Sequence, residues 1–333
     1  MQSTIGKKLI LSIAGGSHEP ELQMTLAGLP AGISIDFDQL QQFLKRRAPG
    51  NSPYTTPRKE EDIPVFLQGF SGSITDGTPI RAIIKNTNIR PGDYKLEVPR
   101  PGHADLMAHL KYQDRLNMSG GGPFSGRMTA PMCVAGGIAL QILEKEGIRT
   151  EARIVSIGHK KAGPHMMDEI LKAKEENDSV GGVVECRVTG LPAGIGGPMF
   201  DGVESQLAAL LFGIPAVRGV EFGAGFQAAS MRGSQHNDEF FVHGDHIRTR
   251  TNNHGGILGG ITSGMPLILR VAFKPTPSIG IPQNSVNLRT MENTTLSTVG
   301  RHDPCVVPRG VPVVEGLVAF GLLDLMMLEE EPA

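Results

Sequence analysis

A chain of 333 residues is long enough for two ordinary domains or for one large domain with a substantial core. Its 32 Lys and Arg residues are balanced by 34 Asp and Glu residues, so no overall positive charge favours nucleic acid or an anionic membrane surface as a partner. The cysteines Cys133, Cys186 and Cys305 lie far apart, and no window reaches the roughly 18 apolar residues of a membrane span. We therefore expect free thiols, no membrane-spanning helix and a cytoplasmic location.

The first predicted elements are two paired strands. Residues 8–15, KLILSIAG, and residues 23–30, QMTLAGLP, flank the turn SHEP, which carries Ser17 and His18. Because imidazole exchanges its proton near neutral pH, His18 in this small, polar turn is a candidate acid or base. A lone histidine in a loop is more often a surface residue, so the position alone does not decide between these interpretations.

A helix is predicted over residues 34–48, SIDFDQLQQFLKRRA. Ser34 or Asp36 is placed to cap its start, and the following Pro-Gly pair ends it. Arg46 and Arg47 in the last turn complement the helix dipole, which is the commonest reason for basic residues there. Two guanidinium groups at a rigid exit could also hold a doubly anionic ligand.

Later segments repeat earlier ones in the same order. GLPAGI begins at Gly28 and again at Gly190, and GSITDGTPI from Gly72 matches GGITSGMPL from Gly259. Each copy continues into a β-branched strand, a basic turn with His and Asp, and an apolar helix. We infer a single domain over residues 1–333 made of two related halves, about 1–150 and 151–333, whose equivalent loops share a cleft. The alternative is that GLPAGI is a strand-ending turn used twice.

The polar stretch LKAKEENDS, residues 171–179, predicts a solvated helix end that separates the two copies. No long linker joins the halves. Alternation of strands and helices along the chain predicts a mixed α and β fold.

The two basic turns are the next candidates for chemistry. In RPGHAD, His103 lies between Arg100 and Asp105, so Asp105 could orient the imidazole and Arg100 could hold an anion. The second copy repeats basic, imidazole and carboxylate groups up to Asp303. A hydrogen-bonded turn is the simpler interpretation of either copy, but its repetition favours a functional one.

Two further segments could bind a ligand. MSGGGPFSGRMTAP from Met118 runs into a predicted helix, and backbone N–H groups at a helix start attract anions. It matches neither a Walker motif nor a dinucleotide fingerprint, and a tight loop without ligand is an equal alternative. KPTPS from Lys274 closes a predicted strand with one cation and two hydroxyls, or is a plain turn. His236, His243 and the histidines after them lack metal-ligand spacing, so we expect no metal.

These motifs together resemble the chorismate synthase family. The most specific stretches are NNHGGILGGITSGMPLILRVAFKPTPSIG from Asn252 and GRHDPCVVPRGVPVVEG from Gly300, together with IPAVRGVEFGAGF from Ile214 and RPGHADLMAHLKY from Arg100. The resemblance covers nearly the whole chain. It implies an α+β fold, a β-α-β sandwich with an internal pseudo-two-fold duplication, assembled as a homotetramer.

The resemblance also implies a reaction. It is the 1,4-anti elimination of phosphate from 5-enolpyruvylshikimate 3-phosphate, giving chorismate, with reduced FMN as cofactor and no net redox change. His18 would protonate the departing phosphate, His103 would lie beside the flavin ring, and Asp303 would take the substrate proton. Ser17 and four arginines would hold substrate and flavin anions: Arg46, Arg47, Arg127 and Arg301. The implied flavin contacts are Pro123, Phe124, Ser125, Pro215, Ala216, Gly259, Lys274, Pro275, Thr276, Pro277, Ser278 and Arg301.

The chain departs from the family pattern at several positions. The usual Gly-Glu-Ser-His-Gly turn is Gly-Gly-Ser-His-Glu here, so a carboxylate has moved from position 16 to Glu19. Pro53 replaces a common basic residue near an NADPH contact, and Pro123 and Phe124 replace a cation and a hydroxyl. Two alternatives therefore accompany the lyase: a non-catalytic, flavin-binding paralogue of the same fold, and a flavin reductase that uses a nicotinamide cofactor.

Overall fold

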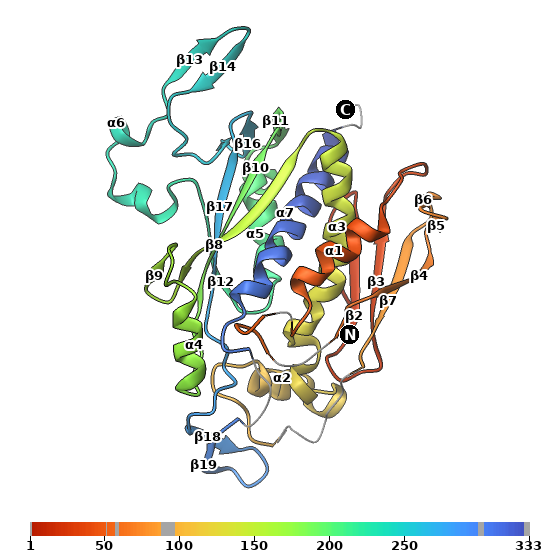
Figure 1. The fold of residues 1–333 in the computed structure, drawn as a ribbon, viewed down its shortest axis with the longest axis vertical. Coiled ribbons are helices and arrows are strands. Elements are labelled where there is room, and N and C mark those ends of the chain that lie inside the picture. The colour runs from red at the N-terminus through yellow and green to blue at the C-terminus, as the bar shows by residue number, and fades with distance from the viewer. Residues whose placement is uncertain (1, 51, 57–59, 88–96, 299–302, 330–333) are drawn as a thin grey trace.

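The computed structural model describes residues 2–50, 52–56, 60–87, 97–298 and 303–329. Two five-stranded sheets form the outer layers, and a layer of helices lies between them (Figure 1). The chain therefore has the mixed α and β architecture that the sequence predicts.

The first sheet is antiparallel and has the strand order β1-β2-β3-β7-β4. Its strands are β1 Gln2–Ile5, β2 Ile10–Gly15, β3 Glu21–Ala27, β7 Ile80–Lys85 and β4 Pro64–Gln68. Alternate residues such as Leu22, Met24 and Leu26 are buried. Because side chains alternate between the faces of a strand, one face of this sheet packs on the helices. The predicted pairing of the first two strands is confirmed: β2 and β3 pair directly, Ile10 opposite Ala27.

The second sheet has the order β12-β17-β10-β8-β9, and its neighbouring strands are antiparallel. Its strands are β12 Val217–Phe222, β17 Leu267–Phe273, β10 Gly182–Thr189, β8 Arg149–Ile157 and β9 Lys160–Lys161. Leu267, Leu269 and Val271 alternate with half-buried residues along β17 and face the core. Helix α4, Asp168–Glu175, contains part of the polar stretch 171–179. It connects β9 to β10 within this sheet, so the prediction that the stretch separates the two halves is wrong.

Four helices fill the layer between the sheets: α1 Phe37–Arg47, α3 Thr129–Lys145, α5 Val203–Phe212 and α7 Val307–Glu329. Asp36 caps α1, as predicted, because its carboxylate accepts hydrogen bonds from the N–H groups of Asp38 and Gln39. Helix α7 is long and apolar enough to span a membrane, but 78% of its apolar window is buried inside the protein. It is therefore the core helix of the fold.

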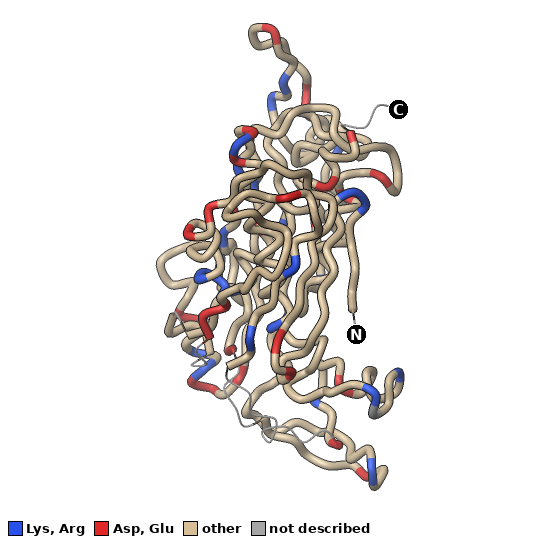
Figure 2. Tube along the Cα trace, turned by 90° about the vertical axis from the view of Figure 1, so that its right-hand side faces the viewer, with Lys and Arg blue, Asp and Glu red and all other residues tan. Residues whose placement is uncertain are grey.

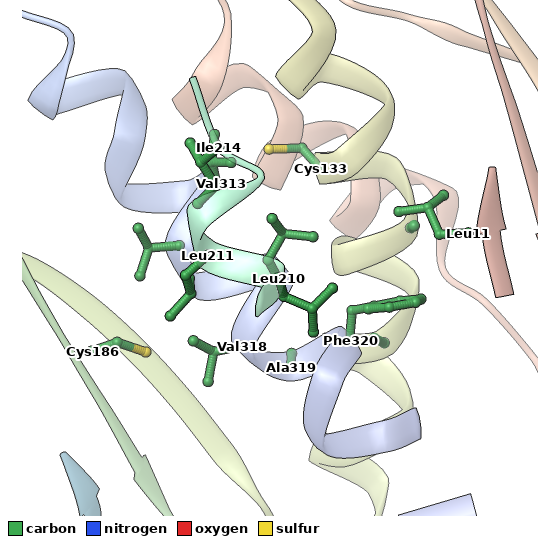
Figure 3. Packing of buried hydrophobic residues seen from close by; sticks show 14 of the residues in the cluster. Leu11, Cys133, Cys186, Leu210, Leu211, Ile214, Val313, Val318, Ala319 and Phe320 are labelled. Atoms are coloured by element: carbon green, nitrogen blue, oxygen red, sulfur yellow. The ribbon is translucent and has the colours of Figure 1, made fainter. Parts of the chain in front are cut away.

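The core is continuous across the helix layer. Figure 3 shows Leu210 of α5 near Ala319 and Phe320 of α7, and Cys133 of α3 on the side of Ile214 and Val313. Cys186, on β10, contributes from the second sheet, and all these side chains are buried. Burial raises the pKa of the Cys133 thiol to about 12, so this thiol is protonated and inert at neutral pH.

Shorter elements surround the sandwich. They are α2 Asp105–Tyr112, α6 Gly233–His236, β5 Phe70–Ser71 with β6 Ile74–Thr75, β11 Ala193–Gly196 with β16 Ile261–Ser263 and β15 Ile257–Leu258, β13 Phe240–His243 with β14 His246–Thr249, and β18 Gln283–Asn287 with β19 Glu292–Leu296. The β13–β14 hairpin projects from one end of the molecule, and β18–β19 lies at the other (Figure 1). Lys and Arg are interspersed with Asp and Glu along the trace, so neither sign dominates one end (Figure 2).

Candidate active site

A cavity of about 510 Å³ collects side chains from both halves of the chain. Its volume is in the range of pockets that enclose a small molecule, roughly 300–1,000 Å³. His18 lies after β2, His103 lies before α2, and Asp303 lies before α7, and all three line the wall. The structure thus brings the three candidate acid–base residues to one cavity.

His18 is held by the glycine-rich loop. Its Nδ1 lies 3.1 Å from the carbonyl oxygen of Ser119, to which the Ser17 hydroxyl also donates at 2.9 Å. In the tautomer that donates Nδ1–H to this carbonyl, Nε2 is the basic nitrogen of His18. The loop therefore fixes the orientation of the imidazole.

Glycine is required where this loop meets the two histidines. Gly120 has φ +63° and Gly121 has φ +93°, in the left-handed region that favours glycine. A Cβ on Gly120 would lie 2.3 Å from Cε1 of His18, and one on Gly121 would lie 3.0 Å from Cε1 of His103. The loop backbone therefore lies directly against both imidazoles.

His103 is oriented by a carboxylate that an arginine also contacts. The Oδ1 atom of Asp105 lies 2.6 Å from Nδ1 of His103, and Arg100 donates to both oxygens of Asp105 at 2.7 and 2.9 Å. Burial opposes the charge on Asp105, but hydrogen bonds from Arg100 and His103 outweigh it and hold its pKa well below the ordinary value. Arg100 also donates to the Ser278 hydroxyl at 3.0 Å, which links this turn to the loop after β17.

Asp303 is held by three contacts. Its Oδ1 accepts from the backbone N–H of Thr56 at 2.8 Å, and its Oδ2 accepts from Arg309 at 2.6 Å. The Thr276 hydroxyl donates to the backbone carbonyl of Asp303 at 2.9 Å. These contacts fix the direction of the carboxylate.

A buried ion cluster lies behind the cavity wall. Asp62 is shared by two arginines: Arg47 donates to Oδ2 at 2.5 Å, and Arg127 donates to Oδ1. Burial would raise the pKa of Asp62, but the two guanidinium groups hold it below the ordinary value. Arg127 reaches the cavity, whereas Arg47 is 1% exposed and has its remaining donors on Thr129 and Gly126.

Several residues assigned from the sequence are elsewhere. Arg46 makes a bidentate pair with Glu315, at 2.6 and 2.9 Å, outside the cavity lining. Gly259 lies in the turn between β15 and β16, and neither it nor Pro275 is part of the wall. Arg301 lies outside the described residues. The remaining assigned residues line the cavity: Ser17, Arg127, Pro123, Phe124, Ser125, Pro215, Ala216, Lys274, Thr276, Pro277 and Ser278.

Sequence reasoning missed part of the wall. Glu60, Thr56, Arg218 and Arg309 line the cavity without having been assigned a role. Arg309 follows Asp303 by six residues at the start of an apolar helix, which is a usable signal for an ion pair at the site. Nothing local marks Glu60 or Asp62, because their partners are distant in the chain.

The fold and cavity define an enzyme that binds a small anionic molecule between titratable groups from both halves of one chain. The model of the chorismate synthase family matches residues 9–327. The chain is 43% identical to chorismate synthase of Korarchaeum cryptofilum, over 97% of this chain and 96% of that protein, and 42% identical to that of Lancefieldella parvula, over 98% and 96%. A crystal structure of chorismate synthase superposes with a TM-score of 0.77 at 26% identity, covering 98% of this chain and 93% of that one.

The chain belongs to the chorismate synthase family. It is therefore a lyase of the shikimate pathway that acts on a phosphate-bearing substrate, and its family binds a flavin. The residues present fit such a group. Phe212, Ile214 and Val217 give the cavity an apolar wall for a flat ring, while Lys274 and the Ser278 hydroxyl supply polar groups for a phosphate tail.

Proposed function

We propose that this cavity is the site of the 1,4-anti elimination of phosphate from 5-enolpyruvylshikimate 3-phosphate, which yields chorismate. The observation that carries the proposal is the meeting of His18, His103 and Asp303, from three distant loops, on one wall. Elimination of phosphate requires a proton for the leaving group and a base for the substrate C–H bond. These three residues supply the titratable groups.

His18 protonates the departing phosphate in this proposal. Its Nδ1 contact with the Ser119 carbonyl supports the role, because it holds Nδ1 in place and leaves Nε2 to carry the proton that the protonated ring gives to the phosphate. Asp303 takes the substrate proton. Its contacts with Thr56 and Arg309 engage each carboxylate oxygen once, so each oxygen retains a lone pair for the proton.

His103 lies beside the flavin ring in the proposal, oriented by Asp105. Reduced FMN, when bound, would supply electron density for the cleavage, and the overall reaction involves no net redox change. The proposed flavin contacts that line the cavity are Pro123, Phe124, Ser125, Pro215, Ala216, Lys274, Thr276, Pro277 and Ser278. Pro275, Gly259 and Arg301 remain flavin contacts by resemblance alone.

Among the arginines, Arg127 remains in the proposal as a substrate contact because it reaches the cavity. Arg301 remains on the strength of the family motif. Arg46 and Arg47 already direct their guanidinium donors at Glu315, Asp62 and backbone or hydroxyl oxygens. We therefore assign these two to support of the cavity wall rather than to direct ligand binding.

The activity is tested by incubating the purified chain with 5-enolpyruvylshikimate 3-phosphate and anaerobically reduced FMN. We expect release of inorganic phosphate together with chorismate. Binding of FMN without phosphate release would instead favour the non-catalytic paralogue. NADPH-dependent bleaching of FMN in the absence of substrate would reveal a reductase activity.

His103→Ala tests the acid–base assignment. We expect turnover to fall by roughly 100-fold or more, the size typical of a general acid–base group, while the thermal unfolding midpoint stays near wild type. His159→Ala is the matched control, because His159 lies on the surface between β8 and β9 and outside the cavity. Near-normal turnover of His103→Ala would remove His103 from the mechanism.

We also propose that the chain is one domain made of two related halves. Supporting this, the order β2-β3-β7-β4 in the first sheet corresponds to β8-β10-β17-β12 in the second. Later in the chain than β3 and β10 come the helices α1 and α5, and later than β7 and β17 come the long helices α3 and α7. The matched GLPAGI segments follow β3 and β10 at corresponding points.

We also propose that the protein is a homotetramer and that it is located in the cytoplasm. Association into an oligomer is supported by large apolar side chains that the single chain exposes, among them Phe226 at 84%, Val242 at 77% and Phe200 at 84%. Exposed apolar groups of this size are typical of association surfaces. Sedimentation equilibrium of the purified chain tests the proposal, and a monomeric mass would contradict it.

A further inference from the structure

The charges around the cavity are unevenly compensated. Within the described residues, Arg100 pairs with Asp105, Arg127 with Asp62 and Glu60, and Arg309 with Asp303. The two other cationic side chains of the wall are Arg218 and Lys274. No carboxylate in the described part of the chain is hydrogen-bonded to either of them, and the Lys274 ammonium donates only to the carbonyl oxygen of Gly102. The excess positive charge of the described wall therefore lies on this pair.

An irregularity in the second sheet places Arg218 beside Lys274. Val217 of β12 pairs with Phe273 of β17, but the next pair joins Gly219 to Ala272, so Arg218 is the extra residue of a β-bulge. A bulge changes the direction in which a side chain points and is common beside active sites. Lys274 directly follows Phe273, so the bulge and the lysine are neighbours across the strand pair.

The backbone just before the bulge is strained. Ala216 has φ +71°, a left-handed conformation that costs a residue with a Cβ roughly 1–2 kcal/mol. Its carbonyl accepts from the Lys274 N–H at 2.9 Å, which fixes the start of β12 against the end of β17. Burial lowers the pKa of Lys274, and the charge of Arg218 lowers it further, so the two cations interact electrostatically. Two like charges held together by a strained backbone indicate a binding role rather than a stabilising one.

We propose that Arg218 and Lys274 together bind the phosphate of a phosphomonoester that enters the cavity, with the bulge serving to bring Arg218 to the site. A guanidinium group donates two parallel hydrogen bonds to such a phosphate, and an adjacent ammonium adds a third donor. Arg218 is thus an anion-binding residue of the site. The inference rests on the proposed function, which offers two sources of this chemistry: the phosphate of FMN and the phosphate of the substrate.

The test compares binding of phosphorylated and unphosphorylated ligands to wild type and Arg218→Gln. Titration calorimetry measures the Kd of FMN and riboflavin, and the Kd of 5-enolpyruvylshikimate 3-phosphate and its dephosphorylated form. We expect Arg218→Gln to weaken one phosphorylated ligand about tenfold, which corresponds to about 1.4 kcal/mol, and to leave its unphosphorylated counterpart unchanged. Loss for FMN assigns the flavin phosphate to the site, and loss for the substrate assigns the substrate phosphate.

Arg187→Gln is the matched control, because Arg187 is an exposed arginine on β10 of the same sheet and lies outside the cavity. Arg218→Lys should recover most of the lost affinity, since it restores the charge. The inference is overturned if Arg218→Gln binds both phosphorylated ligands within about twofold of wild type, or if the unphosphorylated forms weaken equally. These measurements need no turnover: wild type that binds both ligands without releasing phosphate would contradict the proposed function alone.

Discussion

At the scale of single residues, Asp62 shows how the cavity wall is supported. Its side chain is fully buried, its backbone has φ +53°, and its two oxygens accept from two buried arginines, of which Arg47 is paired with this carboxylate and Arg127 with this carboxylate and Glu60. Arg127, one of these arginines, also lines the cavity. The position of a proposed substrate contact therefore depends on a carboxylate that is not itself part of the wall.

Asp62→Asn tests this dependence and keeps a residue type that tolerates the left-handed backbone. Because it leaves two buried cations with a neutral partner, we expect a loss of about 3–5 kcal/mol in the free energy of unfolding, measured by urea denaturation at pH 7. Arg153→Gln, which breaks a largely exposed pair with Glu185, should cost less than about 1 kcal/mol.

Wild type and Asp62→Asn also give a prediction for the pH dependence of stability. The folded pKa of Asp62 is below its ordinary value, so its stabilising effect is complete above about pH 4 and is lost as the pH falls through the folded pKa. Wild type should therefore lose stability in acid more steeply than Asp62→Asn. Parallel acid curves for the two proteins would exclude a stabilising role for this carboxylate.

At the scale of elements, the glycine-rich segment before α3 positions both histidines. Gly121→Ala places a Cβ at 3.0 Å from Cε1 of His103 on a backbone with φ +93°, so the imidazole must move. We expect turnover to fall by about 10- to 100-fold, since displacement of about 1 Å at a reacting group has effects of this size. Steady-state phosphate release measures the effect.

Gly163→Ala is the control for Gly121→Ala, because the added methyl group there meets only one backbone oxygen at 3.8 Å in an exposed turn. A change in the NMR chemical shifts of the His103 ring atoms would show that the ring has moved. Full activity of Gly121→Ala would mean that the loop does not determine the position of the imidazole.

Elements with local signals were predictable from the sequence, and so was the short-range contact of Asp105 with His103, whereas the long-range contacts of the site were not. The β2–β3 pair and the Asp36 cap follow from short-range patterns, and the two long apolar helices follow from composition. Asp62 lies 15 residues beyond Arg47 and 65 before Arg127, so only the folded chain brings these charges together. For the same reason the sequence did not reveal that Arg46, assigned to ligand binding, pairs with Glu315, which is 269 residues away.

At the scale of the whole molecule, the two long helices cross where the halves meet. An ideal Cβ on Gly136 of α3 would lie 2.5 Å from Cα of Gly316 of α7, and one on Gly316 would lie 3.1 Å from Cα of Gly136. These glycines therefore allow the helix backbones to approach closely. The segments just before these helices carry the glycine-rich loop, ahead of α3, and Asp303, ahead of α7, so the crossing also sets the distance between the two sides of the cavity.

Gly136→Ala tests the role of this crossing. The nearest atoms are backbone atoms of the other helix, which cannot rotate away, so the helices must separate. The gain in helix propensity from Gly to Ala, about 1 kcal/mol, opposes this effect. Overpacking of a core typically costs about 1–3 kcal/mol, and we expect a net loss of about 1–2 kcal/mol in the free energy of unfolding together with weaker substrate binding.

Gly233→Ala in α6, where the nearest atom to the added methyl is 4.0 Å away, should leave both quantities unchanged. Equal or greater stability of Gly136→Ala, with unchanged substrate affinity, would show that the helices can separate without cost and that the crossing does not determine the geometry of the cavity.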